Sequence, residues 1–378
     1  MKTLGACFAL LSIPLCPSML FAQDASATGI SRAFNPAISV NGLFSAMATS
    51  REKPLSAEQG VNPGFHYQDI GLEMTSNVDV YLQAKVVFAA EEKTGISPEE
   101  AYVTTLRMPI PVNVRAGKML CTFGQHNLYH LHHMAFSEPP VIHEQVFGPD
   151  LNEVGVEASY LMPFPWYSDL TVGCFNGDNA NLFGSTRQGD YAALVHYDNL
   201  WDLSDHSALR LGASYLSGRK ACGDGLQTAF RSGLSRTWGI DFHWKWRPLR
   251  YGRYRCGVIQ GEYVRSTIRE NGRTTRPLHG FFVQALRQFR LRWWVQARYD
   301  RVERPAVFDQ WFGAEAGFPS GSGDPILIRR WSFAMAFVPT EFSAFRLQFN
   351  WIDAGGRREN QVVFQMNVTI GSHPAHKY

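Results

Sequence analysis

One short stretch of the chain, GQHNLYHLHHM at residues 124–134, is unusually rich in histidine. Its histidines are His126, His130, His132 and His133, and a fifth, His143, follows ten residues later. Imidazole nitrogens bind borderline metals such as zinc. In an extended chain His130 and His132 would point to the same side, because side chains alternate along a strand. His126, His133, His143 or Glu144 would then complete a tetrahedral set, so one hypothesis is a zinc site.

The same histidines have two other interpretations. Neither a zincin motif nor a CxxC pair accompanies them, and imidazoles also serve as hydrogen-bonding and packing groups in a folded loop or as the lining of a pore. Because histidine titrates near neutral pH, a pH-sensitive gate is the third interpretation. His373 and His376, near the end of the chain, are far from this group and are not expected to share an ion with it.

The N-terminus has the layout of a secretory signal peptide. One lysine precedes an apolar run from about Leu4 to Leu15, and small and polar residues follow from Ala22. The run is shorter than the roughly 20 residues that a membrane-spanning helix needs. We therefore expect a signal peptide at 1–22, an N-terminal segment at 23–33 and one β-domain at 34–378.

Composition excludes several classes of function. The chain has 36 basic and 33 acidic residues, so its charge gives no reason to expect nucleic acid as a partner. Four of the six cysteines follow the expected cleavage site, and they are too few and scattered for a disulfide framework, so we expect mostly free thiols. No motif combines a nucleophile with its base. We therefore expect no enzyme, and no cofactor apart from the zinc of the metal hypothesis.

Strict alternation of apolar and polar residues is the clearest pattern in the sequence. It occurs at 237–246, 291–300, 345–351 and 362–370, and is typical of half-buried strands. The longer of these segments exceed the usual strand length of about 5–6 residues, and aromatic residues recur near their ends. Such strands, tilted across hydrocarbon with aromatic girdles, are typical of a transmembrane β-barrel. The fold class that we predict is an all-β, antiparallel, transmembrane barrel.

The number of strands follows from the same alternation. Fourteen or eighteen strands also fit, because several segments alternate weakly, but sixteen candidates fit best. They are centred near Val40, Leu72, Ala84, Val103, Ala116, Val156, Val172, Val195, Leu211, Ile240, Gln260, Val283, Val295, Phe333, Leu347 and Val368.

The connections between these strands alternate in length. Residues 125–152 and 303–327 are long connections, whereas 163–166 and 339–341 are short. Long outer loops and short periplasmic turns are the normal asymmetry of outer-membrane barrels, and an even strand count leaves both termini in the periplasm. The histidine-rich stretch then lies in the third outer loop. Around one periplasmic turn, a rim of basic residues is expected to touch lipid phosphates: Lys245, Arg247, Arg250, Arg253 and Arg255.

Several motifs resemble a known family. They are FNPAISV at 34–40, EEAYVTT followed by VRAGKMLCTFGQHN, the His130-x-His132 pair, GVEASYLMP at 155–163 and the final GSHPAHKY. Together they resemble the phosphate-selective porin O/P-like outer-membrane barrels, a group that includes uncharacterised proteins labelled as zinc-regulated outer-membrane proteins. The resemblance implies a porin-like barrel whose third loop folds into the lumen. It does not imply phosphate selectivity, because no ladder of basic residues can be matched residue by residue.

Strand parity predicts which charged side chains line the pore. The basic candidates are Lys85, Arg115, Arg210, His243, Lys245, Arg292, Arg298, Arg330 and Arg346. The acidic candidates are Glu73, Glu157, Asp241, Glu262 and Asp300. These groups either form salt-bridged ladders that stabilise the wall or leave a net basic lumen, which would concentrate anions.

These observations predict a bacterial outer-membrane channel for passive diffusion of small solutes, with a weak preference for anions. The alternative is a zinc-binding outer-membrane channel or receptor that uses the histidine-rich third loop. Expected partners are outer-membrane lipid, lipopolysaccharide and small solutes or anions. Trimers are common among sixteen-stranded general porins, so a homotrimer is the assembly expected by analogy.

Overall fold

The structure is a computed structural model. It describes residues 36–51, 55, 63–92, 95–184, 189–222, 231–252, 254–270, 273–274, 277–305 and 325–371. The predicted signal peptide, the N-terminal segment, Arg253, His373 and His376 lie outside these ranges.

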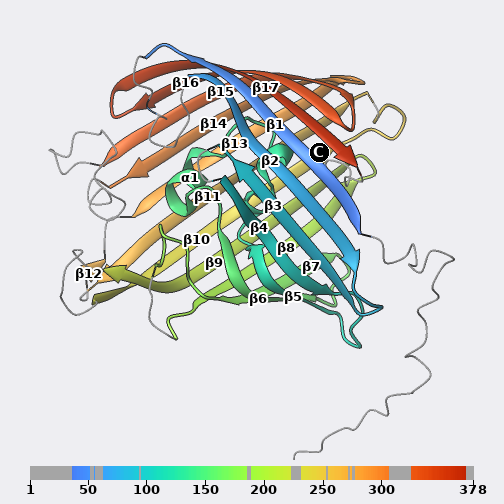
Figure 1. Cartoon of the computed structure of the whole chain (residues 1–378), viewed down its shortest axis with the longest axis vertical. Coiled ribbons are helices and arrows are strands. Elements are labelled where there is room, and N and C mark those ends of the chain that lie inside the picture. Colours follow the sequence, from blue (N-terminus) through green and yellow to red (C-terminus); the bar gives the residue numbers. More distant parts are fainter. Residues whose placement is uncertain are drawn as a thin grey trace, which may run out of the picture.

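Antiparallel strands make up the described part of the chain (Figure 1). The first eight are β1 (Ala37–Thr49), β2 (Gly64–Asn77), β3 (Leu82–Glu91), β4 (Gly95–Thr105), β5 (Val112–Leu120), β6 (Asn152–Leu161), β7 (Tyr167–Phe175) and β8 (Ala192–Ser204). The others are β9 (Ser207–Cys222), β10 (Arg231–Trp246), β11 (Cys256–Glu270), β12 (Arg273–Thr274), β13 (Leu278–Arg290), β14 (Trp293–Arg304), β15 (Ile326–Thr340), β16 (Ser343–Ala354) and β17 (Arg357–Gly371).

The sheet closes on itself, because β1 pairs with both β2 and β17. The two-residue β12 only extends the β11 hairpin, so sixteen of the described strands form the wall. All sixteen predicted strand centres lie within these strands, which confirms the predicted barrel. Each wall strand pairs with two neighbours, as a barrel in hydrocarbon requires, although β4 and β5 pair only from Ala101 to Thr104.

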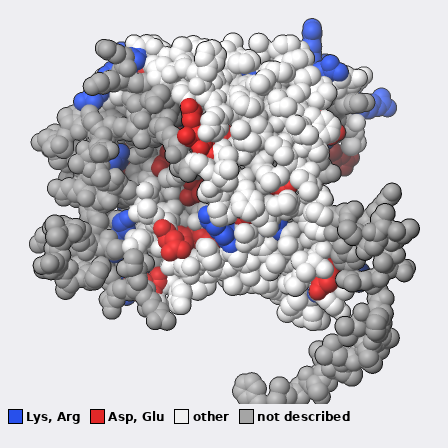
Figure 2. Space-filling view, in the orientation of Figure 1, with Lys and Arg blue, Asp and Glu red and all other residues white. Residues whose placement is uncertain are grey.

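Alternation sorts the side chains between the two faces of the wall. On β10, Trp238 and Ile240 are exposed on the outside, whereas Thr237 and Asp241 are buried inside. On β16, Leu347 is exposed and Gln348 is buried. The outer face is therefore apolar and the lumen polar, as the sequence predicted. In Figure 2 the visible outer face of the wall is largely free of charged side chains.

Two glycines explain how β16 and β17 are joined by a connection of only two residues. The connection between β16 and β17 is only the pair Gly355 and Gly356, and both residues have positive φ (59° and 83°). Two successive residues in that region form the tight turn that suits a right-twisted hairpin, and glycine adopts it without strain. No helix in the described ranges is long and apolar enough to cross a membrane.

The connection between β5 and β6, residues 121–151, is here named the lumen loop. It contains two 3-10 turns, η4 (His126–Leu128) and η5 (Leu131–His133), and one helix, α1 (Val141–Phe147). Figure 1 shows α1 inside the barrel, and it packs against β13 and β14. Its apolar side chains, such as Ile142 and Phe147, join Phe123 and the inward-facing Phe282 in a buried core. The expectation that the third loop folds into the lumen is therefore met by the structure.

Candidate functional site

The candidate site is the lumen, and the lumen loop determines how much of it stays open. Four groups of polar contacts fix the loop to the wall. They involve strands on several sides of the barrel, namely β2, β4, β9, β11 and β14 to β17. The loop thus crosses the lumen and is held at both its start and its end.

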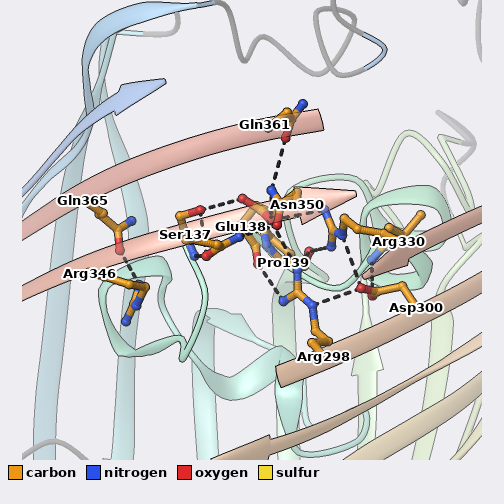
Figure 3. Close-up of polar contacts among 12 residues, drawn as sticks. Ser137, Glu138, Pro139, Arg298, Asp300, Arg330, Arg346, Asn350, Gln361 and Gln365 are labelled. Atoms are coloured by element: carbon orange, nitrogen blue, oxygen red, sulfur yellow. Dashed lines mark hydrogen bonds and ion pairs between the residues drawn. The ribbon is translucent and has the colours of Figure 1, made fainter. Parts of the chain in front are cut away.

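The first group surrounds Asp300 of β14 (Figure 3). One carboxylate oxygen, Oδ2, lies 3.0 Å from Nε of Arg298 and 3.2 Å from Nε of Arg330. The other, Oδ1, accepts the N–H of Val141, the first residue of α1, at 3.0 Å. Arg330 also donates to the carbonyl oxygen of Pro139 at 2.6 Å. Glu138 lies 3.5 Å from Arg298 and 3.6 Å from Arg330, so Asp300 and Glu138 together balance the two buried guanidinium groups. Asp300 also supplies one of the acceptors that the start of a helix lacks.

The second group lies on β16 and β17. Gln348 and Asn350 donate to Oε1 of Glu138 at 2.6 and 3.0 Å (Figure 3). Arg346 donates to the carbonyl oxygen of Met134 at 2.9 Å, and Asn367 donates to another loop carbonyl at 3.1 Å. These wall side chains bind loop backbone and a loop carboxylate, so they hold the loop and are turned away from open water.

The third group converges on Glu262 of β11. Its Oε1 accepts the backbone N–H groups of Gln125 (2.9 Å) and His126 (2.6 Å), and its Oε2 lies 2.7 Å from Nε2 of His143. Gly124 has φ +60°, and a Cβ there would stand 2.7 Å from Oε2 of Glu262. The approach of the loop to this carboxylate therefore requires glycine.

The fourth group holds His130. Its Nδ1 lies 3.0 Å from Oε1 of Glu99, and its Nε2 lies 3.0 Å from Oε2 of Glu100. Since each contact needs a proton on nitrogen, the ring is an imidazolium. Burial opposes this charge, but the hydrogen bonds and charges of Glu100 and Glu99 outweigh it and raise the pKa of His130 to about 10. Lys85 also lies 2.9 Å from Glu100, so the carboxylate is shared.

The five histidines do not converge on one point. His126 packs against His143 (ring centroids 5.0 Å apart) and Phe282 (5.2 Å), whereas His130, His132 and His133 form a separate stack. Burial, assisted by His143 and Arg298, lowers the pKa of His126 well below its usual value. Within the described ranges, no group of three or more His, Cys, Asp or Glu side chains could hold a metal ion. The hypothesis of a zinc site formed by these histidines has no support there.

The predicted lumen side chains differ in their exposure. Arg298, Arg330, Arg346, Glu262 and Asp300 are buried against the lumen loop. Others are partly exposed inside the barrel: Glu73, Lys85, Arg115, Arg210, His243 and Lys245. Glu157 and Asp241 are buried.

Arg292 was predicted from strand parity to face the lumen, and this prediction is wrong. It lies in the turn between β13 and β14 and is exposed, because β14 begins only at Trp293. The prediction continued the alternation of β14 into the turn that precedes it, where side chains no longer alternate between the two faces of a sheet. Arg292 is therefore no part of the lumen wall.

Three pairs on the partly open wall share one arrangement. Lys85 lies 2.9 Å from Glu100, Arg210 lies 2.7 Å from Asp198, and Arg115 pairs with Glu157. The basic side chains are 21, 27 and 24% exposed, while their acidic partners are only 4, 3 and 2% exposed. We call Lys85, Arg115 and Arg210 the basic tips. The water in the lumen thus meets these positive groups, while Glu100, Asp198 and Glu157 lie behind them. Lys85 also lies 3.9 Å from Glu73, whose side chain is 15% exposed.

Sequence reasoning missed several of these residues. Glu100 and Asp198 lie on the lumen side by parity, and a systematic count of every strand would have found them. Glu138, in contrast, lies in the lumen loop, and no period in the sequence indicates its contacts with β16.

Comparisons with known proteins agree with this architecture. No family model matches the chain. A relative from Aquifex aeolicus (strain VF5), an uncharacterized protein, is 27% identical over 344 residues, covering 83% of this chain and 70% of the relative. Among solved structures, OprB of Pseudomonas putida has a TM-score of 0.60 at 11% identity, covering 90% of this chain and 94% of its own. The anion-selective porin of Comamonas acidovorans has a TM-score of 0.57 at 10% identity, covering 89% and 100%. The chain therefore has a porin-like outer-membrane barrel fold.

Proposed function

We propose that this protein is an outer-membrane diffusion channel for small solutes, narrowed by the lumen loop and weakly selective for anions. The observation that carries the proposal is the set of basic tips, which are partly exposed while their carboxylate partners are buried. The closed barrel, its apolar outer face and its likeness to porins support the location and the general function.

The selectivity follows from solvent access. Seen from far away, the buried carboxylate cancels much of the positive charge of its basic partner. A solute that touches the wall, however, meets the N–H donors of the basic side chain first. Anions gain hydrogen bonds at the basic tips, whereas Glu100, Asp198 and Glu157 are buried and leave cations mainly the partly exposed Glu73. Because the pairs are nearly neutral overall, the preference is weak. Passage needs no covalent chemistry, so we propose a channel and no enzyme.

Liposome swelling tests the proposal with solutes of similar size and different charge. Vesicles containing the refolded protein are exposed to a small carboxylate, a neutral sugar and an amine. The carboxylate is expected to enter fastest and the amine slowest. Fastest entry of the amine would refute the anion preference, and absence of swelling with all three would refute the channel.

Export and assembly complete the proposal. We propose that residues 1–22 direct export through the secretory pathway and that the folded barrel forms homotrimers. Mass spectrometry of protein from outer membranes, with and without chemical crosslinking, tests both points. A mature chain that retains residues 1–22, or a monomer after crosslinking, would contradict them.

A further inference from the structure

The lipid-facing side of the barrel carries a groove of about 460 Å³ that the channel does not use. Its size lies within the range of about 300–1,000 Å³ that is usual for small-ligand sites. It crosses β10, β11, β13, β14 and β15, which lie side by side in the wall (Figure 1).

Two rows of residues, in register across these strands, contribute to the groove, and Trp246 and Met335 flank it at the two ends of the second row. The row farther from the turns is Trp244, Ile259, Ala285, Ala297 and Phe333. The row nearer the turns is Trp246, Gly257, Arg287, Val295 and Met335. The small residues Ala285 and Ala297 form the floor, and Trp244 and Phe333 stand on either side. The floor and walls are hydrocarbon, so the groove suits an acyl chain.

Arg287 gives the groove a charged end. It is exposed on the outer face, three residues before β13 ends at Arg290. Its guanidinium carbon lies 4.8 Å from the ring centroid of Trp246, and a cation there is attracted to the aromatic face. Gly257 lies between these two residues. A Cβ at Gly257 would meet the Arg287 guanidinium at 3.5 Å, so the bare backbone leaves room for this side chain.

The guanidinium of Arg287 is available to bind an anion from outside the chain. Among the described residues, its guanidinium contacts Trp246 and forms no ion pair with a carboxylate. The end of the barrel with short turns, where Arg287 lies, also exposes Arg250 and Arg255 in the turn before β11 and Arg292 in the turn after β13. Guanidinium groups bind phosphate strongly, and aromatic residues at this depth are typical of the membrane interface.

We propose that the groove binds one phospholipid, with an acyl chain lying on Ala285 and Ala297 and the phosphate held by Arg287. The proposal rests on the proposed outer-membrane location but not on conduction. Apolar floor, aromatic walls and a single cation at the headgroup level match the chemistry of a phospholipid from the periplasmic leaflet.

Native mass spectrometry of the detergent-refolded protein, titrated with phosphatidylglycerol, tests this site. The unmodified protein is expected to retain one tightly bound lipid. Arg287→Gln is expected to weaken binding roughly tenfold, because the phosphate loses its charged partner. Ala297→Phe, which fills the floor, is expected to abolish it. Diacylglycerol lacks the phosphate. Its affinity for the unmodified protein is therefore expected to be no higher than the affinity of phosphatidylglycerol for Arg287→Gln.

Two matched controls lie elsewhere on the lipid-facing surface. Ala213→Phe adds the same bulk on β9, and Arg301→Gln removes an exposed arginine near the other end of the barrel. Both are expected to retain the lipid. Equal retention by the unmodified protein and by Arg287→Gln would overturn the site, even if Ala297→Phe fails to fold. A protein dimer or trimer that Ala297→Phe dissociates would overturn it too, because a second copy of the chain would then cover the groove.

Discussion

At the scale of single residues, the lumen loop is held by charges that would be costly to bury alone. His130 lies between two carboxylates, and Glu262 accepts two backbone N–H groups and contacts His143. In each contact the attraction between the two partners offsets the hydration that they lose on burial. Removing one partner therefore leaves a buried charge without compensation, which destabilises the fold. Of the histidines that first suggested a metal site, His130 therefore acts as a buried cation and the others serve as hydrogen-bonding and packing groups of the loop.

The pH dependence of stability follows from His130. Its folded pKa of about 10 lies above its usual value of 6.5, so its stabilising effect is complete below pH 6.5 and is lost as pH rises toward 10. We expect the difference in urea midpoint between the unmodified barrel and His130→Gln to be largest at pH 6 and to shrink steadily by pH 10. A difference that grows with pH would show that His130 is not a buried imidazolium.

Gly124 offers a second prediction at this scale. Gly124→Ala is expected to destabilise the protein by about 1–3 kcal/mol, because the added Cβ would strike the Glu262 carboxylate and alanine is strained at this positive φ. Loosening of the loop should also make single-channel currents larger and noisier. Gly184→Ala is the matched control, since Gly184 has φ +71° and a Cβ added there would meet no atom within 4 Å. Equal channel noise in both variants would rule out a specific role for Gly124.

At the scale of elements, α1 depends on its anchor. A helix of seven residues is marginal by itself, so tertiary contacts must stabilise it. Asp300→Asn is expected to cost about 3–5 kcal/mol in unfolding free energy, because Arg298 and Arg330 lose their shared counter-charge. It should also increase conductance by releasing the loop. Asp353→Asn, near the β16–β17 turn, is the control. Unchanged stability and conductance in Asp300→Asn would contradict the anchoring role.

The elements also show what a sequence can reveal. Period-two alternation located all the wall strands, because each strand faces lipid on one side and the polar lumen on the other. The contacts that fix the path of the lumen loop could not be predicted from the sequence. The contact from Asp300 to Val141 joins residues 159 positions apart, and no local pattern encodes it. Parity also failed at Arg292, because β14 begins later than the alternation suggested.

At the scale of the whole molecule, one barrel presents two chemically different faces. Its outer face is apolar and suits lipid, while the lumen contains a loop fixed to several sides of the wall and the partly exposed basic tips. The arginines buried against the loop contribute to its position, so they cannot attract solutes in the way that a simple count of charges predicted. The weak anion preference that we propose depends mainly on the three partly exposed basic tips.

The most direct measurement is the reversal potential of single channels in a planar bilayer under a KCl gradient. The unmodified protein is expected to give an anion-sided potential. The triple variant Lys85→Gln, Arg115→Gln and Arg210→Gln should open with comparable steps but shift the potential to zero or to the cation side, since the buried carboxylates lose their cover. A cation-sided potential in the unmodified protein, or an unchanged anion-sided potential in the triple variant, would contradict the account.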